Sequence, residues 1–388
     1  MFPFFIFLAC QFYVTNCQFF TFPTFGPTPA PVTVPATTTV TVRVTNVSST
    51  QIANTTIVPT TSTTTQRPIL DIAREIIRDD LAWSYENQDK WRTLSDTCTK
   101  GERQSPIALS LEDSVTSPGL RNDKLQFNNY DKRIGGKLVN TGQAVVWNVD
   151  ILADKNSAPN ISGCGLLNFY ILGQIVFKTS PPARNAFVEC CSGSEHIVEF
   201  KRYPMEVQFV HYNSNYDKME DAVRKSDGLA IISFLFQRTS ETSSVEFTPI
   251  VKALPTISTP LVRSAELPMI PDRLVPSFAK DSGIFFRYQG SLTAPPCEES
   301  VKWTVYRNIG KINMEDLKRF WFDVERIFAS NLTNINEPRR SYRNIQARNK
   351  RQIFTNGIFF NKFSFIINIL IQQVRVAVLQ LRQCTFQV

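Results

Sequence analysis

The sequence predicts an α+β fold dominated by β-strands, and three observations predict it. The chain has 388 residues, 43% of them hydrophobic, which is enough for one domain of about 250 residues with a sizeable core. Short runs of β-branched and aromatic residues alternate with Gly, Pro, Asn and Asp in the middle of the chain. One segment there repeats its apolar residues at helical spacing. Together these features indicate an antiparallel or mixed sheet with short helices around it.

The chain begins with an apolar segment typical of a signal peptide. Residues 1–20 contain a hydrophobic run too short to span a bilayer, although no basic residue precedes it. The sequence Asn-X-Ser/Thr, the acceptor for N-linked glycans, occurs at Asn46, Asn54, Asn160 and Asn331. We therefore expect an extracellular, secreted glycoprotein.

Residues 21–68 form a segment rich in Thr, Pro and Val that carries almost no charge. Such a segment cannot bury enough apolar surface to offset its chain entropy, so we expect it to be disordered. Two interpretations stay open. The segment is either a mucin-like, O-glycosylated stalk that holds the domain away from a surface, or a leader without a function of its own.

The predicted domain covers residues 69–346, and its β-type runs are the candidate strands. The runs are 138–140, 145–149, 169–177, 205–212 and 229–236. A helix is predicted over 313–328, where apolar residues recur at helical spacing at Met314, Leu317, Phe320, Trp321, Val324 and Ile327.

Residues 347–388 form a basic and then apolar tail. Between residues 335 and 388, nine Lys or Arg stand against one acid, which accounts for the whole formal charge of +8. The domain itself therefore lacks a basic field, and we expect no nucleic-acid partner. Lys362 interrupts the apolar stretch 353–371, so we expect a disordered tail with membrane contact only through that stretch. The basic run 348–351 predicts either cleavage after Arg351 or a solvated segment.

Five blocks, in one order along the chain, carry a resemblance to a known family. They are Trp83-Ser84-Tyr85 with Trp91, Gly101 to Ile107, Gly193 to His196, Glu206 to Asn213, and Gly290 to Cys297 followed by Trp303. The chain resembles the α-carbonic anhydrase family, and the block from Glu206 is most similar to its secreted, acatalytic carbonic anhydrase-related proteins. The resemblance implies a single domain around a large, mostly antiparallel, twisted central sheet, with short peripheral helices and a cleft at the middle of the sheet.

The resemblance also places three residues where the family binds zinc. In the family, two histidines at alternate positions of one strand and a third on the antiparallel neighbour hold the ion. Here those positions hold Val176, Lys178 and Gln208. Valine has no donor atom, glutamine is a poor zinc ligand, and lysine brings a positive charge to the place of the cation. We therefore expect no metal, no other cofactor and no catalysis.

Further roles follow from the same resemblance. Gln143 takes the position of the proton-shuttle histidine, while Glu195 and Thr293 match the pair that orients the metal-bound hydroxide. Val210, Ile231 and Leu292 match the apolar wall of the pocket, and His196 and His211 match structural histidines.

Lys178 raises a separate question of charge. An ammonium that points inward needs an acceptor or must lose its proton. We therefore expect Lys178 to bond to Gln208, or through water to Glu195.

Six cysteines remain once the signal peptide is removed. The resemblance pairs Cys98 with Cys297. The partners of the others stay open, because Cys164 can pair with Cys190 or Cys191 and leave an odd thiol for Cys384 or for another chain. A metal site built from Cys164, Cys190, Cys191 and His196 is a weaker alternative.

The sequence therefore favours a catalytically inactive extracellular protein that recognises a cell-surface or extracellular protein partner. The alternative from another class is a zinc-dependent carbonate dehydratase that hydrates CO2, which the substituted ligand positions disfavour. A third possibility is a passive matrix component.

Overall fold

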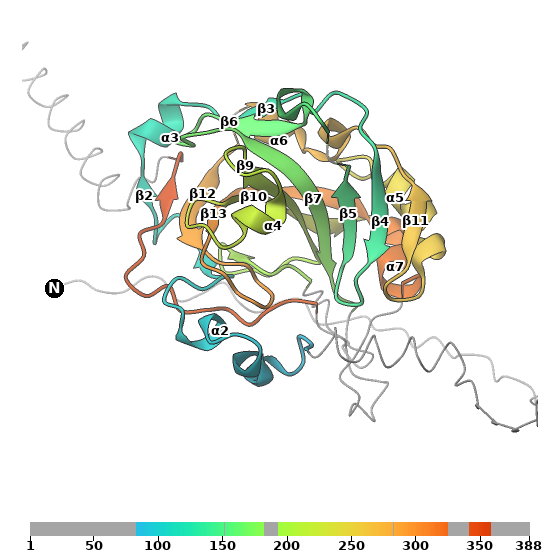
Figure 1. The fold of residues 1–388 in the computed structure, drawn as a ribbon, viewed down its shortest axis with the longest axis horizontal. Helices are drawn as coiled ribbons and strands as arrows, with labels where there is room; N and C mark the ends of the chain where they lie inside the picture. The colour runs from blue at the N-terminus through green and yellow to red at the C-terminus, as the bar shows by residue number, and fades with distance from the viewer. Residues whose placement is uncertain (1–82, 151, 182–192, 282, 325–340, 358–388) are drawn as a thin grey trace, which may run out of the picture. The chain divides into compact units, whose positions relative to one another are not determined.

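A computed structural model describes residues 83–150, 152–181, 193–281, 283–324 and 341–357. Most of the strands in these ranges join one mixed sheet (Figure 1). From one edge to the other its order is β11 (Arg263–Glu266), β4 (Gly136–Asn140), β5 (Val145–Val149), β7 (Tyr170–Thr179), β9 (Met205–Asn213), β10 (Leu229–Thr239), β13 (Val301–Asn313), β12 (Phe285–Gly290), β14 (Phe354–Thr355) and β2 (Val115–Thr116).

The pairing along this sheet is mostly antiparallel. Only β10 with β13 and β14 with β2 run parallel among the neighbours in the described sheet. The strands β3 (Gln126–Asn128) and β6 (Asn160–Ser162) attach beside β7, and β1 (Ala108–Leu109) forms a separate parallel pair with β8 (Ile197–Val198). The prediction of a large, mostly antiparallel central sheet is confirmed.

The strands near the centre of the sheet lie where the sequence predicts them. The bounds of β5 agree with the prediction, and β4, β7, β9 and β10 reach only a few residues beyond their predicted ends. The longest described strand, β13, was not predicted. Its second half carries Arg307, Asn308 and Lys311, whose polarity hides the alternation expected of a strand.

The two faces of the sheet differ in composition because successive side chains of a strand point to opposite sides. On the face that we call the packed face, Phe177, Phe209 and Phe234 belong to the larger hydrophobic cluster. On the opposite face, which we call the site face, Val176, Val210 and Ile231 belong to or pack against a second cluster. Polar residues join this second face, so it is the face that positions the candidate site.

The helices are short and lie around the sheet (Figure 1). They are the α-helices α2 (Thr97–Lys100), α3 (Pro118–Asn122), α4 (Met219–Ala222), α5 (Thr248–Ala253), α6 (Ser277–Asp281) and α7 (Met314–Phe322), and the 3-10 helices η1 (Gln88–Thr93), η2 (Lys155–Ser157), η3 (Leu254–Ile257) and η4 (Pro271–Leu274).

Helix α7 begins where the sequence predicts a helix. The Asn313 side chain caps it by accepting a hydrogen bond from Glu315 N at 2.8 Å. Leu317 and Phe320 are buried in the larger cluster, as their spacing predicts. The predicted continuation beyond residue 324 lies outside the described residues.

The domain extends past residue 346, which was its predicted end. Strand β14 pairs with β12 and β2, and Figure 1 shows it beside β2 although the two lie far apart in the sequence. Ile353 and Thr355 are fully buried. The prediction of a tail from residue 347 is therefore corrected, because a strand of two residues is too short to give a pattern. Cleavage after Arg351 would remove β14.

Several predictions concern residues outside the described ranges. They are the signal peptide (1–20), the stalk (21–68), the tail from residue 358, the acceptors Asn46, Asn54 and Asn331, and Cys190, Cys191 and Cys384. Within the described part of the chain, no helix combines the length and the hydropathy needed to cross a membrane.

Candidate functional site

Strands β7 and β9 bring Val176, Lys178 and Gln208 to one side of the sheet. Val176 pairs with Gln208 across the two strands, and Lys178 pairs with Glu206. Directly opposed residues of an antiparallel pair point to the same face, as do residues two apart on one strand. The four side chains therefore all belong to the site face at the middle of the sheet.

Lys178 is a buried cation. Its side chain is 6% exposed, and Nζ donates to the Tyr85 hydroxyl at 2.5 Å and lies 3.4 Å from Glu195 Oε1. Burial lowers the pKa of Lys178, but the charge of Glu195 and the contact with Tyr85 outweigh it and raise that pKa above its ordinary value. Burial raises the pKa of Tyr85 to about 12, so Tyr85 stays a neutral phenol. The ammonium is thus charged at neutral pH.

The contacts of Lys178 differ from those expected. The sequence predicts a bond to Gln208 or a water-mediated contact with Glu195, whereas Nζ lies beside Glu195, too close for an intervening water, and donates to Tyr85. Tyr85 belongs to the first of the five blocks, but the sequence predicts no role for it. Its place beside Lys178 depends on the path of the chain before η1, which no local pattern predicts.

Glu195 is fully buried and accepts several hydrogen bonds. Its Oε2 accepts from Thr293 Oγ1 at 2.5 Å and from Gln208 Nε2 at 2.9 Å, and its Oε1 accepts from Arg343 N at 3.4 Å. The structure therefore brings Glu195 and Thr293 into contact. We use the name Lys178 cluster for Lys178, Tyr85, Glu195, Gln208 and Thr293.

A second buried carboxylate, Glu206, lies beside this cluster. Gln208 Nε2 donates to Glu206 Oε1 at 2.9 Å, so the same amide nitrogen bridges Glu206 and Glu195. His196 Nδ1 and Ser233 Oγ also bond to Oε1, at 2.8 Å and 2.7 Å. Although burial raises the pKa of Glu206, these contacts lower it to about 2. Glu206 is therefore ionised at neutral pH.

The remaining predicted residues have structural contacts. Val210 and Ile231 are buried in the second cluster, and Leu292 packs against that cluster, as Val176 does. Gln143 is 7% exposed, and its Nε2 donates to Trp83 O at 3.0 Å.

The two histidines lie on different faces of the sheet. His196 bonds Glu206 through Nδ1 and the Tyr288 hydroxyl, at 2.7 Å, through Nε2. His211 belongs to the packed face, where it bonds to the Tyr130 hydroxyl and to Ala230 O. Burial lowers the pKa of His211 to about 3, so that its ring is neutral. The contacts of both residues agree with the structural roles expected of them.

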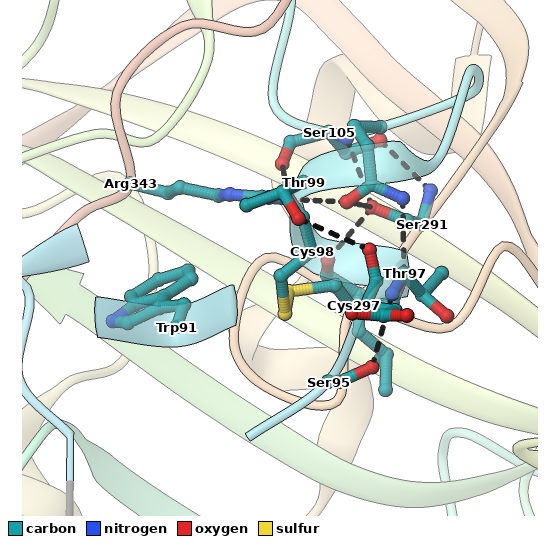
Figure 2. Close-up of a disulfide and its surroundings, with 12 residues drawn as sticks. Trp91, Ser95, Thr97, Cys98, Thr99, Ser105, Ser291, Cys297 and Arg343 are labelled. Carbon is teal, nitrogen blue, oxygen red and sulfur yellow. Dashed lines mark hydrogen bonds between the residues drawn. A yellow bond between two sulfur atoms is a disulfide. The ribbon is translucent and has the colours of Figure 1, made fainter. Parts of the chain in front are cut away.

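The disulfide expected between Cys98 and Cys297 is present (Figure 2). It joins residues 199 positions apart, with Cα atoms separated by 5.0 Å. Figure 2 shows Arg343 extended past Trp91 toward this bridge. Its guanidinium donates to Cys98 O at 2.7 Å and to Ser105 O at 2.9 Å. Arg343, which sequence reasoning missed, thus links the segment of Cys98 and Ser105 to Glu195, which accepts from Arg343 N.

The donor atoms at the site do not suit a zinc ion. Zinc is bound in proteins by Cys, His, Asp or Glu ligands. Val176 offers no donor, the Lys178 ammonium has no lone pair, and the Gln208 amide nitrogen donates to two carboxylates. No group of three or more His, Cys, Asp or Glu side chains within the described ranges is placed to hold a metal.

The weaker alternative of a cysteine-based metal site also lacks free ligands. Both ring nitrogens of His196 are already engaged, by Glu206 and Tyr288. Cys164 is a free, buried thiol in the part of the chain that is described, and burial raises its pKa. The partners proposed for it, Cys190 and Cys191, lie outside the described residues.

Asn160 is a poor acceptor for a glycan in the folded domain. It lies in β6 with 5% of its surface exposed. Its Nδ2 donates to Ala158 O at 2.9 Å, and its Oδ1 accepts from Asn128 at 3.0 Å. The structure therefore argues against the predicted glycan at Asn160, because the amide that would carry the sugar is buried and hydrogen-bonded.

Comparisons with known proteins identify the family and several relatives of this chain. Residues 86–357 match the family described as eukaryotic-type carbonic anhydrase. Carbonic anhydrase 4 of Oryctolagus cuniculus is 30% identical over 270 residues, or 66% of this chain and 81% of that protein. Carbonic anhydrase 15 of Mus musculus is 31% identical over 259 residues, or 61% and 72%. Receptor-type tyrosine-protein phosphatase zeta of Homo sapiens is 25% identical over 287 residues, or 72% of this chain but 12% of that protein.

Proposed function

This chain belongs to the eukaryotic-type carbonic anhydrase family, and from that premise we propose that it is catalytically inactive and acts outside the cell as a protein-recognition module. In this proposal the chain falls within the secreted, acatalytic part of the family. Its partner is a cell-surface or extracellular protein.

The observation that carries the proposal is the buried ammonium of Lys178 between Tyr85 and Glu195. By the family resemblance, this strand position is where a zinc ligand would stand. A unit charge already neutralises Glu195 there, and a divalent cation a few ångströms away would be strongly repelled in so buried a place. The side chain thus takes over the electrostatic role of an ion without its chemistry.

The neighbours of Lys178 support the same conclusion. Gln208 could face a cation only by turning its amide, and its Nε2 would then lose both hydrogen bonds to Glu195 and Glu206. The free-energy cost of removing a hydrogen-bond donor from two buried carboxylates exceeds the gain from one weak metal ligand. Val176 contributes only apolar surface to this face.

The rival proposal is a zinc-dependent carbonate dehydratase that hydrates CO2. It is favoured by the names of the relatives, most of which are carbonic anhydrases. It requires a bound ion to generate hydroxide at neutral pH, and the residues at the three expected positions offer no ligand set for that ion.

Metal analysis and CO2 hydration measured on the full secreted chain distinguish the two proposals. After exposure to excess zinc and removal of free metal, we expect far less than one zinc per chain and no hydration above the uncatalysed rate. The variant that combines Val176→His, Lys178→His and Gln208→His is the matched control, and we expect it to retain about one zinc per chain. Stoichiometric zinc in the unmodified chain, with CO2 turnover, would refute the proposal.

Secretion is supported by the disulfide between Cys98 and Cys297, since such bonds persist in oxidising compartments. A role in recognition is supported by the match to a relative named as a receptor, of which the similar part makes up only a fraction. Labelled full-length chain should bind intact cells saturably, and excess unlabelled chain should compete. Binding that never saturates, or that survives removal of surface proteins by protease, would favour the passive matrix component instead.

A further inference from the structure

A cavity of about 460 Å³ lies where β12, β13 and β14 approach the loop at Cys164 and Gly165. Its lining includes the cationic residues Arg103, Arg287, Lys302 and Arg351 and no Asp or Glu among the described residues. None of these residues belongs to the Lys178 cluster. A concave site with several cations and no carboxylate attracts anions.

Arg287 is the most deeply placed cation of this cavity, at 6% exposure. Its Nε donates to Thr304 Oγ1 at 2.9 Å and its Nη1 to Cys164 O at 2.9 Å. Its Nη2 is buried and has no hydrogen-bond partner within the described residues. Buried polar groups are normally satisfied, and a guanidinium that lacks one partner and any carboxylate is costly. The hydrogen-bond partners of Arg287 among the described residues are a hydroxyl and a backbone oxygen, so a positive charge with no carboxylate beside it lies in the wall of the cavity, which is the first indication of an anionic ligand.

Lys302 adds a second positive charge, and no described carboxylate forms an ion pair with it. Its Nζ lies 3.4 Å from Gly165 O, which is a long contact. Burial, followed by the positive charge of Arg287, lowers the pKa of Lys302. The negative charge of Asp227 raises that pKa, but the Asp227 carboxylate accepts hydrogen bonds from Asn213 and Tyr216, not from Lys302.

The other two cations differ in their pairing. Arg103 pairs with Glu299, so its charge is largely compensated. Arg351 donates to the backbone oxygens of Gln289 and Ala347 and lies over the Tyr288 ring. Arg287, Lys302 and Arg351 therefore leave the cavity with a net positive charge.

We propose that this cavity binds an organic anion in which a sulfate or phosphate monoester is attached to a ring-sized group. A tetrahedral oxyanion can accept charge-assisted hydrogen bonds from Arg287 and Lys302 at once. The volume falls within the roughly 300–1,000 Å³ of small-molecule pockets and exceeds what a bare oxyanion fills. Leu120, Tyr288 and Phe354 supply the apolar lining for the remainder of the ligand.

Calorimetric titration of the full chain tests this proposal with 4-nitrophenyl sulfate, 4-nitrophenyl phosphate, inorganic sulfate and uncharged 4-nitrobenzyl alcohol. We expect one of the two aryl esters to bind saturably, and inorganic sulfate and the alcohol to bind at least about tenfold more weakly. If inorganic sulfate binds as tightly as the esters, the site takes a free oxyanion and the organic group is refuted. No saturable binding of either ester overturns the proposal.

Two variants place the ligand in this cavity. Lys302→Met and Arg287→Lys should each weaken binding by about tenfold or more, because each removes a charge-assisted hydrogen bond. Lys311→Met removes the same charge elsewhere on β13, where Lys311 pairs with Glu241, and should leave binding unchanged. Thermal unfolding checks that each variant folds. If Arg287→Lys does not fold, the affinity of Lys302→Met alone tests the proposal. Unchanged affinity in a folded Lys302→Met chain would refute the assignment.

Discussion

At the scale of single residues, the balance of charge depends on Lys178. Glu195 and Glu206 are both fully buried, and the Gln208 amide joins them. Two carboxylates in such a place need positive charge or hydrogen-bond donors nearby. Lys178 supplies it to Glu195, and His196 bonds to Glu206. The polar centre of the sheet is thus completed by side chains alone.

Replacing Lys178 with Met should destabilise the domain strongly. The substitution leaves the buried carboxyl group of Glu195 without its cation, and removing one partner of a buried ion pair typically costs about 3–5 kcal/mol. Urea unfolding followed by tryptophan fluorescence measures the loss. The double variant Lys178→Met with Glu195→Gln should recover part of it, because the uncompensated charge is removed as well. Lys311→Met, at an exposed ion pair, should cost less than about 1 kcal/mol. Equal stability of the Lys178 variant and the original chain would contradict this account.

His211 should make the domain sensitive to acid. Its pKa is lowered from 6.5 to about 3 by burial, so the unfolded chain binds a proton more readily between these values. Its contribution to stability is complete above pH 6.5 and is lost as the pH falls toward 3, by about 1.4 kcal/mol per unit.

His211→Gln tests this pH dependence and keeps groups that can bond to Ala230 and Tyr130. We expect the slope of the unfolding free energy between pH 6 and pH 5 to fall by about 1.4 kcal/mol per unit in the variant. The difference between the two chains isolates His211 from other titrating groups. An identical slope would show that the buried ring does not control acid stability.

The candidate site could be predicted only in part from sequence. The family resemblance located Val176, Lys178 and Gln208, and the pairing of β7 with β9 brings them together. The partners of Lys178 could not be found, because Tyr85 comes from a distant segment, 93 residues away in the sequence. Local patterns encode the strand that carries a side chain, but not the distant segment packed against it.

At the scale of elements, β14 shows where sequence patterns fail. Central strands are long and give readable alternation, so β5 and β9 could be located from sequence within a residue. Strand β14 has two residues and lies in the sheet only because β12 and β2 flank it. Short strands of this kind are specified by their neighbours rather than by their own sequence.

Ending the chain after Arg351 should therefore destabilise the domain. Ile353 O accepts from Val115 N at 2.8 Å, and the fully buried Ile353 and Thr355 would be lost. Burial of the Ile353 side chain alone is worth about 1.5–3 kcal/mol. A chain that ends after Gly357 keeps β14 and is the matched control. The melting temperatures of the two chains should differ by several degrees. Equal melting temperatures would contradict the prediction and show that the domain stays stable without β14.

At the scale of the whole molecule, the bridge between Cys98 and Cys297 joins the segment before β1 to the loop that carries Thr293. Arg343 strengthens the same junction by donating to Cys98 O and Ser105 O, and Gln104 Nε2 donates to Cys297 O at 3.2 Å. Segments that carry Cys98, Cys297 and Arg343 therefore meet beside the Lys178 cluster, to which Arg343 N donates at Glu195. The bridge restricts the unfolded chain, and its two cysteines pack in one hydrophobic cluster with Tyr85, which accepts from Lys178.

Replacing both cysteines with serine should accordingly have two effects. Unfolding should become easier by about 2–5 kcal/mol, because a loop of 199 residues is no longer closed in the unfolded state. In this variant, Lys178→Met should reduce the free energy of unfolding by less than it does in the original chain. The reason is that a looser Tyr85 segment admits water to Glu195, and the water screens its charge. A double-mutant cycle between the cysteine pair and Lys178, read by urea unfolding, measures this coupling. If the two changes in unfolding free energy simply add, the bridge acts only on the entropy of the unfolded chain.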